Sequence, residues 1–296
     1  MKSMSAWIAA GILLAVAACQ PPDLPPRQGS IGDLDPLTPY VDPFIGTGGH
    51  GHVYPGATMP WGMVQLSPDQ GKGGWDWIAG YNWEDSLLVG FSHTHLSGTG
   101  IGDLLDVLVM PVSRYFPVNE AIEDRWDRSA RSRFSHEREE ASPGYYSVYL
   151  EDQGIQAELT ATTRVGVHRY TYSATDQPAV FLDLGYGMNW DTPVETSIRI
   201  VNDTLITGYR HSQGWARDQR LFFSLAFSEP VQSVGFSEGE TPLDVLDRDR
   251  VTGGGHRATS TGLRALFAFE PMAAGQELSL KVGLSYVCLL YTSPSP

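Results

Sequence analysis

The sequence predicts an all-β fold, a large antiparallel β-sandwich, on three observations. The 296 residues include 32 glycines and 20 prolines, a composition that favours turns over long helices. From position 41 onward, short apolar stretches are separated by Gly, Pro, Asn and Asp, and no helical period runs through them. Several stretches alternate apolar and polar residues, which is the pattern of strands that have one buried and one solvated face.

The chain begins with the features of an export signal. Lys2 precedes an apolar run from Ala6 to Ala18 that is too short for a comfortable membrane span. The run ends in Val-Ala-Ala-Cys, which resembles a bacterial lipobox, so we expect a lipoprotein signal peptide over residues 1–19 and lipidation at Cys19. An ordinary cleavage site with an incidental cysteine is the alternative. Residues 20–39, rich in Pro, Gly and Asp, are expected to form a flexible linker.

The segment from residue 40 to residue 111 is denser in Trp, His, Gly and Asp than a core requires. Trp75, Trp77 and Trp83 lie in one Gly-flanked stretch, and each indole N–H needs a partner if it is buried. A flat aromatic wall beside carboxylates and imidazoles suits a pyranose, because the C–H face of the ring stacks while its hydroxyls meet polar groups. Ordinary packing is the alternative for each indole.

His93 and His95 are two residues apart, so on a strand both would project from the same face. This spacing is compatible with zinc if a third and a fourth ligand came from His50, His52, Asp103 or elsewhere, but it matches no established zinc motif. Hydrogen bonding to sugar hydroxyls, or support of a domain junction, is the favoured use of the pair. A plain structural role for one of the two stays open.

Later segments supply most of the predicted strands. A hairpin is expected from Tyr145–Leu150, a turn at residues 152–154 and a strand at 155–162. Further strands are expected at 164–172, 179–184, 197–201, 204–208, 221–227, 263–269 and 277–287. The charged stretch 119–138 is interpreted as a solvated excursion. Residues 288–296 resemble a translated sequencing adapter, so the folded domain is expected over 40–287.

Four ordered blocks resemble the N-terminal domain of glycoside hydrolase family 92. They are residues 41–48 (VDPFIGTG), 54–63 (YPGATMPWGM), 90–100 (GFSHTHLSGTG) and 142–148 (SPGYYSV). The similarity extends more loosely from residue 40 to residue 287. It implies a supersandwich of the galactose-mutarotase type, followed in the full-length family by an (α/α)6 helical domain that this chain is expected to lack.

The resemblance also implies a function. Family members are calcium-dependent, inverting exo-α-mannosidases that act on N-glycans or mannan, and many are exported bacterial lipoproteins. Inversion needs an acid and a base held about 6.5–9.5 Å apart. In the family both, and the calcium ligands, belong to the helical domain, so we expect no catalytic or metal residue here and no activity from this chain alone. The substrate-binding residues we expect are Trp75, Trp77, His93, His95 and Asp103.

The expected partners are a mannose-containing glycan, the helical domain and, through the lipid anchor, a bacterial membrane facing the periplasm or the exterior. An apolar patch is expected where the helical domain would dock. The net charge of -14 argues against a nucleic-acid partner, because binding to a phosphate backbone requires clustered Lys and Arg. A stand-alone carbohydrate-binding lipoprotein is the alternative function.

Overall fold

The computed structural model describes residues 37–114, 130–239 and 241–292. Contacts divide the chain into Met1–Leu37 and Thr38–Pro296, and the elements described below belong to the second unit. The predicted signal peptide, the lipidation site Cys19 and most of the predicted linker lie outside the described residues. Within the described part, no helix has the length and apolar character that crossing a membrane would require.

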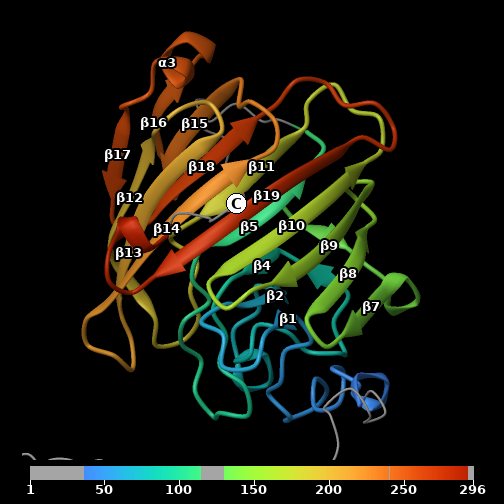
Figure 1. Ribbon diagram of the computed structural model, residues 1–296. Coiled ribbons are helices and arrows are strands. Elements are labelled where there is room, and N and C mark those ends of the chain that lie inside the picture. Colours follow the sequence, from blue (N-terminus) through green and yellow to red (C-terminus); the bar gives the residue numbers. More distant parts are fainter. Residues whose placement is uncertain (1–36, 115–129, 240, 293–296) are drawn as a thin grey trace, which may run out of the picture. The chain divides into compact units, whose positions relative to one another are not determined.

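Two large antiparallel sheets make up the described part of this unit (Figure 1). The eight-stranded sheet has the spatial order β1 (Ala57–Thr58), β2 (Gln65–Asp69), β4 (Gly90–Ser92), β5 (Leu108–Val112), β11 (Ala179–Asp183), β18 (Leu263–Ala268), β15 (Ser233–Glu238) and β16 (Thr241–Leu246). The nine-stranded sheet has the order β17 (Arg257–Ser260), β12 (Thr192–Ile200), β13 (Leu205–Gln213), β14 (Gln219–Phe227), β19 (Glu277–Ser285), β10 (Val165–Tyr172), β9 (Ile155–Ala161), β8 (Tyr145–Leu150) and β7 (Glu139–Ser142).

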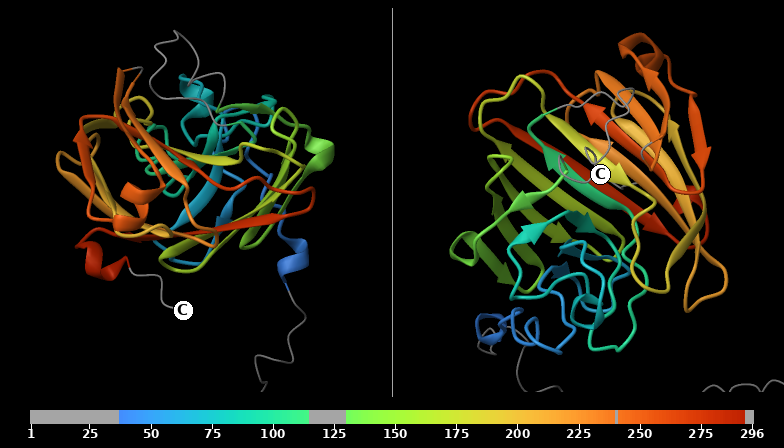
Figure 2. Two further views of the ribbon diagram at one scale, coloured as in Figure 1. Left: turned by 90° about the horizontal axis from the view of Figure 1, so that it is seen from above. Right: turned by 180° about the vertical axis from the view of Figure 1, so that it is seen from behind.

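The smaller elements lie in the connections. They are the paired strands β3 (Leu87–Leu88) and β6 (Ser132–Arg133), the 3-10 turns η2 (Thr38–Tyr40), η3 (Trp75–Trp77), η4 (His136–Arg138) and η5 (Leu289–Tyr291), and the helix α3 (Arg248–Gly253). Asp247 caps α3 by accepting the Arg250 N–H, and the helix ends at Gly254, whose φ of 62° favours glycine. Figure 2 shows from above and from behind that the sheets form two layers.

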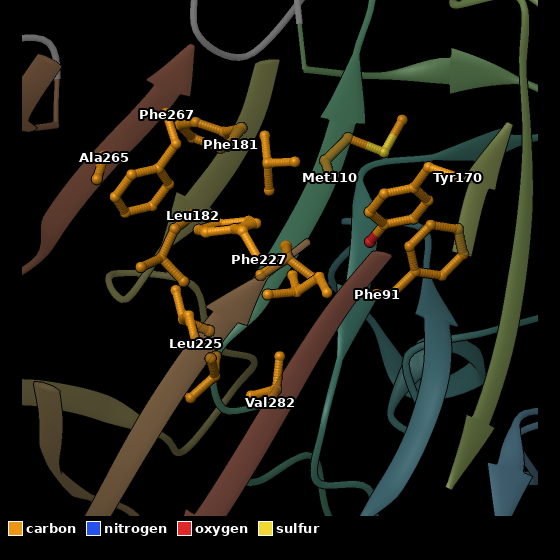
Figure 3. Close-up of a cluster of buried hydrophobic side chains, with 14 of the residues drawn as sticks. Phe91, Met110, Tyr170, Phe181, Leu182, Leu225, Phe227, Ala265, Phe267 and Val282 are labelled. Atoms are coloured by element: carbon orange, nitrogen blue, oxygen red, sulfur yellow. The ribbon is translucent and has the colours of Figure 1, made fainter. Parts of the chain in front are cut away.

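The core lies between the two sheets and follows from the alternation of side chains along the strands. Phe267 of β18 meets Phe227 of β14 across the layers, with ring centroids 5.5 Å apart. Leu182 and Ala265, paired neighbours in the eight-stranded sheet, join Leu225 and Val282 of the opposite sheet in the same buried cluster (Figure 3). Burial of this continuous apolar layer supplies the main stabilisation of the sandwich.

The predicted sandwich is confirmed, and each strand predicted from residue 145 onward is present with ends shifted by a few residues. Ser197–Val201 was too short a prediction for β12, because a bulge between Pro193 and Glu195 interrupts the alternation. The stretch 119–138 lies partly outside the described residues. In its described portion Ser132 and Phe134 are buried, so that portion is less solvated than the charge pattern suggested.

Three connections emerge at one end of the sandwich and carry the site. They are residues 93–107 between β4 and β5, residues 184–191 between β11 and β12, and residues 214–218 between β13 and β14. Arg210 near the end of β13 bonds to Asp106 of the first connection and Asp191 of the second, so the three lie together. Short strands around these connections, such as β4 and β5, were not predicted because they offer too few residues to show a period.

Candidate functional site

Three exposed tryptophans surround the segment 100–103. Trp75, Trp190 and Trp215 keep 56%, 60% and 60% of their surface exposed. Each contacts that segment through a different group, and we call the three side chains the tryptophan rim. A concentration of exposed large aromatic side chains is typical of interaction sites, so the tryptophan rim is a candidate binding surface.

Trp75 is held between a histidine and a glycine. The His52 ring meets the indole edge-on, with centroids 4.8 Å apart and an interplanar angle of 84°. A Cβ on Gly100 would lie 2.7 Å from Cη2 of Trp75, so only glycine permits this approach. His52 has a φ of 55°, an uncommon conformation for a residue with a side chain. Trp75 is therefore a fixed platform, half open to solvent.

Trp215 is fixed through Asp103, one of the predicted site residues. The buried Asp103 carboxylate accepts the N–H of Trp215 at 2.9 Å and the N–H of Leu104 at 3.0 Å. A Cβ on the preceding Gly214 would lie 2.2 Å from Asp103 Oδ1, so glycine is required beside the carboxylate. Asp103 thus positions the 214–218 connection, and its oxygens are engaged by backbone groups.

Trp190 reaches the same segment through its backbone. Its N–H donates to the Gly102 carbonyl at 3.2 Å. The preceding Asn189 has a φ of 53° and packs so closely that a Cβ on Gly102 would lie 2.5 Å from its Nδ2. Trp190 and Trp215 were not identified from the sequence. Both lie in turns beside Gly, Asn or Asp, as Trp75 does. Unlike Trp75, neither has another tryptophan close by in the sequence, so neither was predicted.

Trp77 lies beneath the rim rather than on it. Its half-buried ring packs on the small cluster of Ile78, Leu105 and Met188, and Lys72 Nζ lies 5.1 Å from the ring centroid. The indole Nε1 is buried and has no hydrogen-bond partner among the described residues. This placement supports the rim from below and gives Trp77 little surface for a ligand.

His93 lies in the interior, where direct contact with a sugar in this chain is not possible. Its Nδ1–H donates to the Val107 carbonyl at 2.7 Å, and Nε2 lies 2.9 Å from Nε2 of His168. The side chain has no exposed surface, and burial lowers its pKa to about 3, so it is neutral at physiological pH. The predicted shared face assumed a strand, but His93 and His95 follow β4 in the 93–107 connection, so their two-residue spacing does not set a common face.

His95 is buried as well. Its Nδ1–H donates to the Gln65 carbonyl at 2.8 Å, while Nε2 lies 3.3 Å from Asp69 Oδ1 and 3.2 Å from the Ser92 hydroxyl. The side chain therefore ties β2 to the start of the 93–107 connection. Both histidines hold in place the segment that carries Asp103, and neither reaches the open surface.

The four histidines considered for zinc do not meet. His50 is exposed and pairs with Asp76, His52 packs on Trp75, and the other two have the separate partners described above. Across residues 37–114, 130–239 and 241–292, no group of three or more His, Cys, Asp or Glu side chains could hold a metal ion. These four histidines therefore do not form a zinc site in the described part of the chain.

A cavity of about 280 Å³ is bordered by residues of β5, β11 and β18 of the eight-stranded sheet and by the 184–191 connection. The described residues that line it include Phe181, Asp183 and Arg264, and the rim tryptophans are not among them. It borders Ala130 and Arg131, next to a part of the chain that the structure does not describe. The rim is therefore an open wall and not the mouth of this cavity.

Solved structures similar to this chain include mannosidases of family 92. A family 92 α-mannosidase from Bacteroides thetaiotaomicron, in complex with mannoimidazole, matches with a TM-score of 0.75 and 37% identity over 85% of this chain. An inverting family 92 mannosidase of the same bacterium matches with a TM-score of 0.69 and 26% identity over 87% of this chain. The chain spans 33% and 32% of these two structures.

A curated relative gives a coarser match. An uncharacterised secreted glycosidase of Arthroderma benhamiae is 30% identical over 155 residues, which cover 49% of this chain and 19% of the relative. The Glycosyl hydrolase family 92 N-terminal domain matches residues 40–285, which includes both sheets and all three rim tryptophans. With that match, and with the fold shared with solved family members, the chain belongs to glycosyl hydrolase family 92, as an example of its N-terminal domain.

Proposed function

We propose that this chain is the substrate-recognising part of an exported, calcium-dependent, inverting exo-α-mannosidase that acts on N-glycans or mannan. In this proposal the tryptophan rim forms one wall of the mannose site. The catalytic acid, the base and the calcium ligands belong to a helical domain that follows residue 287. The observation that supports it best is the meeting of three exposed tryptophans at segment 100–103 in a member of this glycosidase family.

The rim suits a sugar for simple chemical reasons. Indole faces offer broad apolar area to the C–H face of a pyranose at low entropic cost, because few bonds must be fixed. The rim is assembled before any ligand arrives, since Gly100, Gly102 and Asp103 already hold the three tryptophans. Three aromatic groups around one segment provide room for more than one sugar unit, as in a branched glycan.

The carboxylates near the rim are engaged in holding the structure. Asp103 accepts two backbone N–H groups, and Asp106 and Asp191 pair with Arg210 inside the protein. Asp76, the exposed one, pairs with His50. These groups do not form the free acid and base that inversion needs. Among the described residues, no group of three or more His, Cys, Asp or Glu side chains is placed to hold calcium, which takes six to eight oxygens.

Calorimetry with mannobiose tests the recognition step. We expect the purified chain to bind mannobiose, and Trp75→Ala, Trp190→Ala and Trp215→Ala each to weaken binding about tenfold, in line with the loss of one stacked ring. Trp83→Ala is the matched control, because that ring stacks on His136 at 3.8 Å. No heat from the wild-type chain at high ligand concentration, or equal losses from Trp83→Ala, would contradict the proposal.

Two further measurements test the proposed helical domain and the proposed lipid anchor. Sequencing the genomic locus should reveal an in-frame helical domain rich in Asp and Glu after the codon for Val287, and the joined protein should release mannose only with calcium present. A stop codon there, with sugar binding intact, would favour the stand-alone binding lipoprotein.

For the anchor, Cys19→Ser should abolish incorporation of labelled palmitate, and unchanged labelling would contradict lipidation at this residue.

A further inference from the structure

We propose that Arg210 is the positioning residue of the tryptophan rim. This side chain binds the connection that carries Trp190 directly, and it binds the segment that fixes Trp215 through Asp106. Its part in sugar binding rests on the proposed function, whereas its part in placing the two tryptophans does not.

The guanidinium of Arg210 uses all five of its N–H groups. Nε donates to the Leu184 carbonyl at 3.0 Å, and Nη2 donates to the Tyr186 carbonyl at 2.9 Å. Nη1 donates to Asp106 at 2.7 Å and to Asp191 at 3.2 Å, and Nη2 makes a second, shorter bond to Asp191. Four of the five bonds go to residues 184–191, so one side chain fixes the path of that connection just before and after Trp190.

The Arg210 side chain joins the two sheets at the end that carries the rim. It belongs to β13 of the nine-stranded sheet, while Leu184 directly follows β11 and Asp106 shortly precedes β5 of the eight-stranded sheet. Arg210, Asp106 and Asp191 have no exposed side-chain surface. The guanidinium lies between two carboxylates and is bonded to groups of both sheets. Its position is therefore fixed, as a rigid support requires.

The two carboxylates of Asp106 and Asp191 keep the buried Arg210 guanidinium charged. Burial raises the pKa of Asp106 although the Arg210 charge opposes this, and Thr94 and Gln219 donate further hydrogen bonds to its second oxygen at 2.8 and 3.1 Å. Burial works against the charge of Arg210, but Asp106 and Asp191 together raise its pKa. The guanidinium therefore stays charged, and lysine, which has three donors and no planar fork, could not replace its five directed bonds.

The segment from Asp103 to Val107 needs such a support. Leu104, Leu105 and Val107 have φ values of 70°, 62° and 58°, a region that residues with side chains avoid. This backbone persists where its surroundings fix it, and here the two flanking carboxylates do so. Asp106 is fixed by Arg210, and Asp103 then lies where it accepts the Trp215 N–H. Removing the guanidinium fork should thus release Trp190 and Trp215 together.

Fluorine NMR of the chain labelled with 5-fluorotryptophan tests the positioning role. The eight tryptophans give resolved reporters, and Trp190→Phe and Trp215→Phe assign the two signals of interest. In Arg210→Lys we expect these two signals to shift and broaden, while the Trp61 and Trp83 signals stay. Leu225→Ala, a core change in β14, is the control for lost stability and should leave the Trp190 and Trp215 signals in place.

A second variant keeps the test valid if Arg210→Lys fails to fold. Asp191→Asn keeps the Arg210–Asp106 pair and should disturb Trp190 alone. Unmoved Trp190 and Trp215 signals in a folded Arg210→Lys, or an unmoved Trp190 signal in Asp191→Asn, would overturn the positioning role. Mannobiose affinity should fall about tenfold or more in Arg210→Lys. If the wild type binds no mannobiose, the proposed function fails while the NMR result still decides this inference.

Discussion

Single buried residues set the direction of the hydrogen bonds that run beneath the rim. The Val107 carbonyl can only accept, so His93 carries its proton on Nδ1 and offers its Nε2 lone pair to His168. His168 must then hold its proton on Nε2 and accept at Nδ1 from the Tyr170 hydroxyl, 2.8 Å away. Protonation of His93 would set its Nε2–H against the Nε2–H of His168. Protonation of His168 would remove the acceptor that its Nδ1 offers to the Tyr170 hydroxyl.

This arrangement predicts a loss of stability in mild acid. Burial lowers the pKa of His93 to about 3 and that of His168 well below its usual value, so the unfolded chain binds these protons first. The stabilising effect is complete above about pH 6.5 and is lost as the pH falls toward 3, at about 1.4 kcal/mol per pH unit for each histidine.

Urea denaturation at several pH values checks this expectation. His168→Gln keeps a donor toward His93 and an acceptor toward Tyr170, so it should fold and reduce the acid slope of the unfolding free energy by about one proton. A wild-type unfolding free energy that is constant between pH 7 and pH 4.5, or an unchanged slope in the variant, would contradict the neutral pair.

Trp61 offers a second prediction at this scale. Its side chain is 98% exposed, and its φ is 57°. A left-handed conformation costs about 1–2 kcal/mol for a residue with a Cβ, and burial recovers nothing here. Trp61→Gly should therefore raise the free energy of unfolding by about 0.5–1 kcal/mol after the entropy cost of glycine. Trp61→Ala, which keeps the Cβ, should stay within about 0.5 kcal/mol of the wild type, and a destabilised glycine variant would show that the ring supports the fold.

At the scale of elements, glycines decide where strands come close. Gly208 of β13 is paired with Ile198 on one side and Phe223 on the other. A Cβ there would lie 2.2 Å from the Ser197 carbonyl oxygen and 2.4 Å from Phe223 Cζ. Gly208→Ala should cost about 2–3 kcal/mol in urea denaturation, because three strands must separate. Gly253→Ala, where a Cβ would meet no atom within 4 Å, should change little, and equal effects of the two substitutions would contradict this account.

The sequence predicted elements well where a strand is long enough to show its period. β8, β9, β10, β13, β14 and β19 each carry six or more residues of alternating or continuous apolar character. It could not place strands of two or three residues, such as β1, β3 and β4, which are fixed by pairing rather than by their own pattern. Trp75 and Asp103 were predicted as site residues because their neighbourhood is unusual, and the structure places both at the tryptophan rim. Trp190 and Trp215 were not, because only folding brings them to segment 100–103.

At the scale of the whole unit, the last strand ends beside the rim. Ser285 at the end of β19 pairs with Phe222 near the start of β14, the strand that follows the Trp215 connection. The following Tyr286 is 47% exposed as a whole residue, while burial of its hydroxyl, and then the charges of Asp106 and Asp103, raise its pKa. Polypeptide that continues from residue 287 would therefore start near the strand that follows the Trp215 connection.

The exposed Trp61 lies in the same neighbourhood. Met63, two residues later, donates its N–H to the Thr163 carbonyl at 2.7 Å, and the adjacent Arg164 carbonyl accepts the Leu284 N–H at 3.0 Å. The turn of Trp61 and the end of β19 thus flank one hairpin, beside the half-exposed Met59 and Tyr286. Exposed apolar groups gathered around a chain exit are typical of a surface that another domain covers.

Radical footprinting tests whether a following domain covers this surface. The present chain and the same chain joined to the residues encoded downstream would be oxidised in parallel, and Trp61 should react severalfold more slowly in the longer protein. Trp83, whose ring already stacks on His136, is the internal control and should react equally in both. If Trp61 is oxidised at the same rate in the two proteins, the following domain docks elsewhere, and the strain at Trp61 needs another explanation. If Trp61 is protected while the rim tryptophans stay reactive, the domain covers this hairpin and leaves the mannose wall open to substrate.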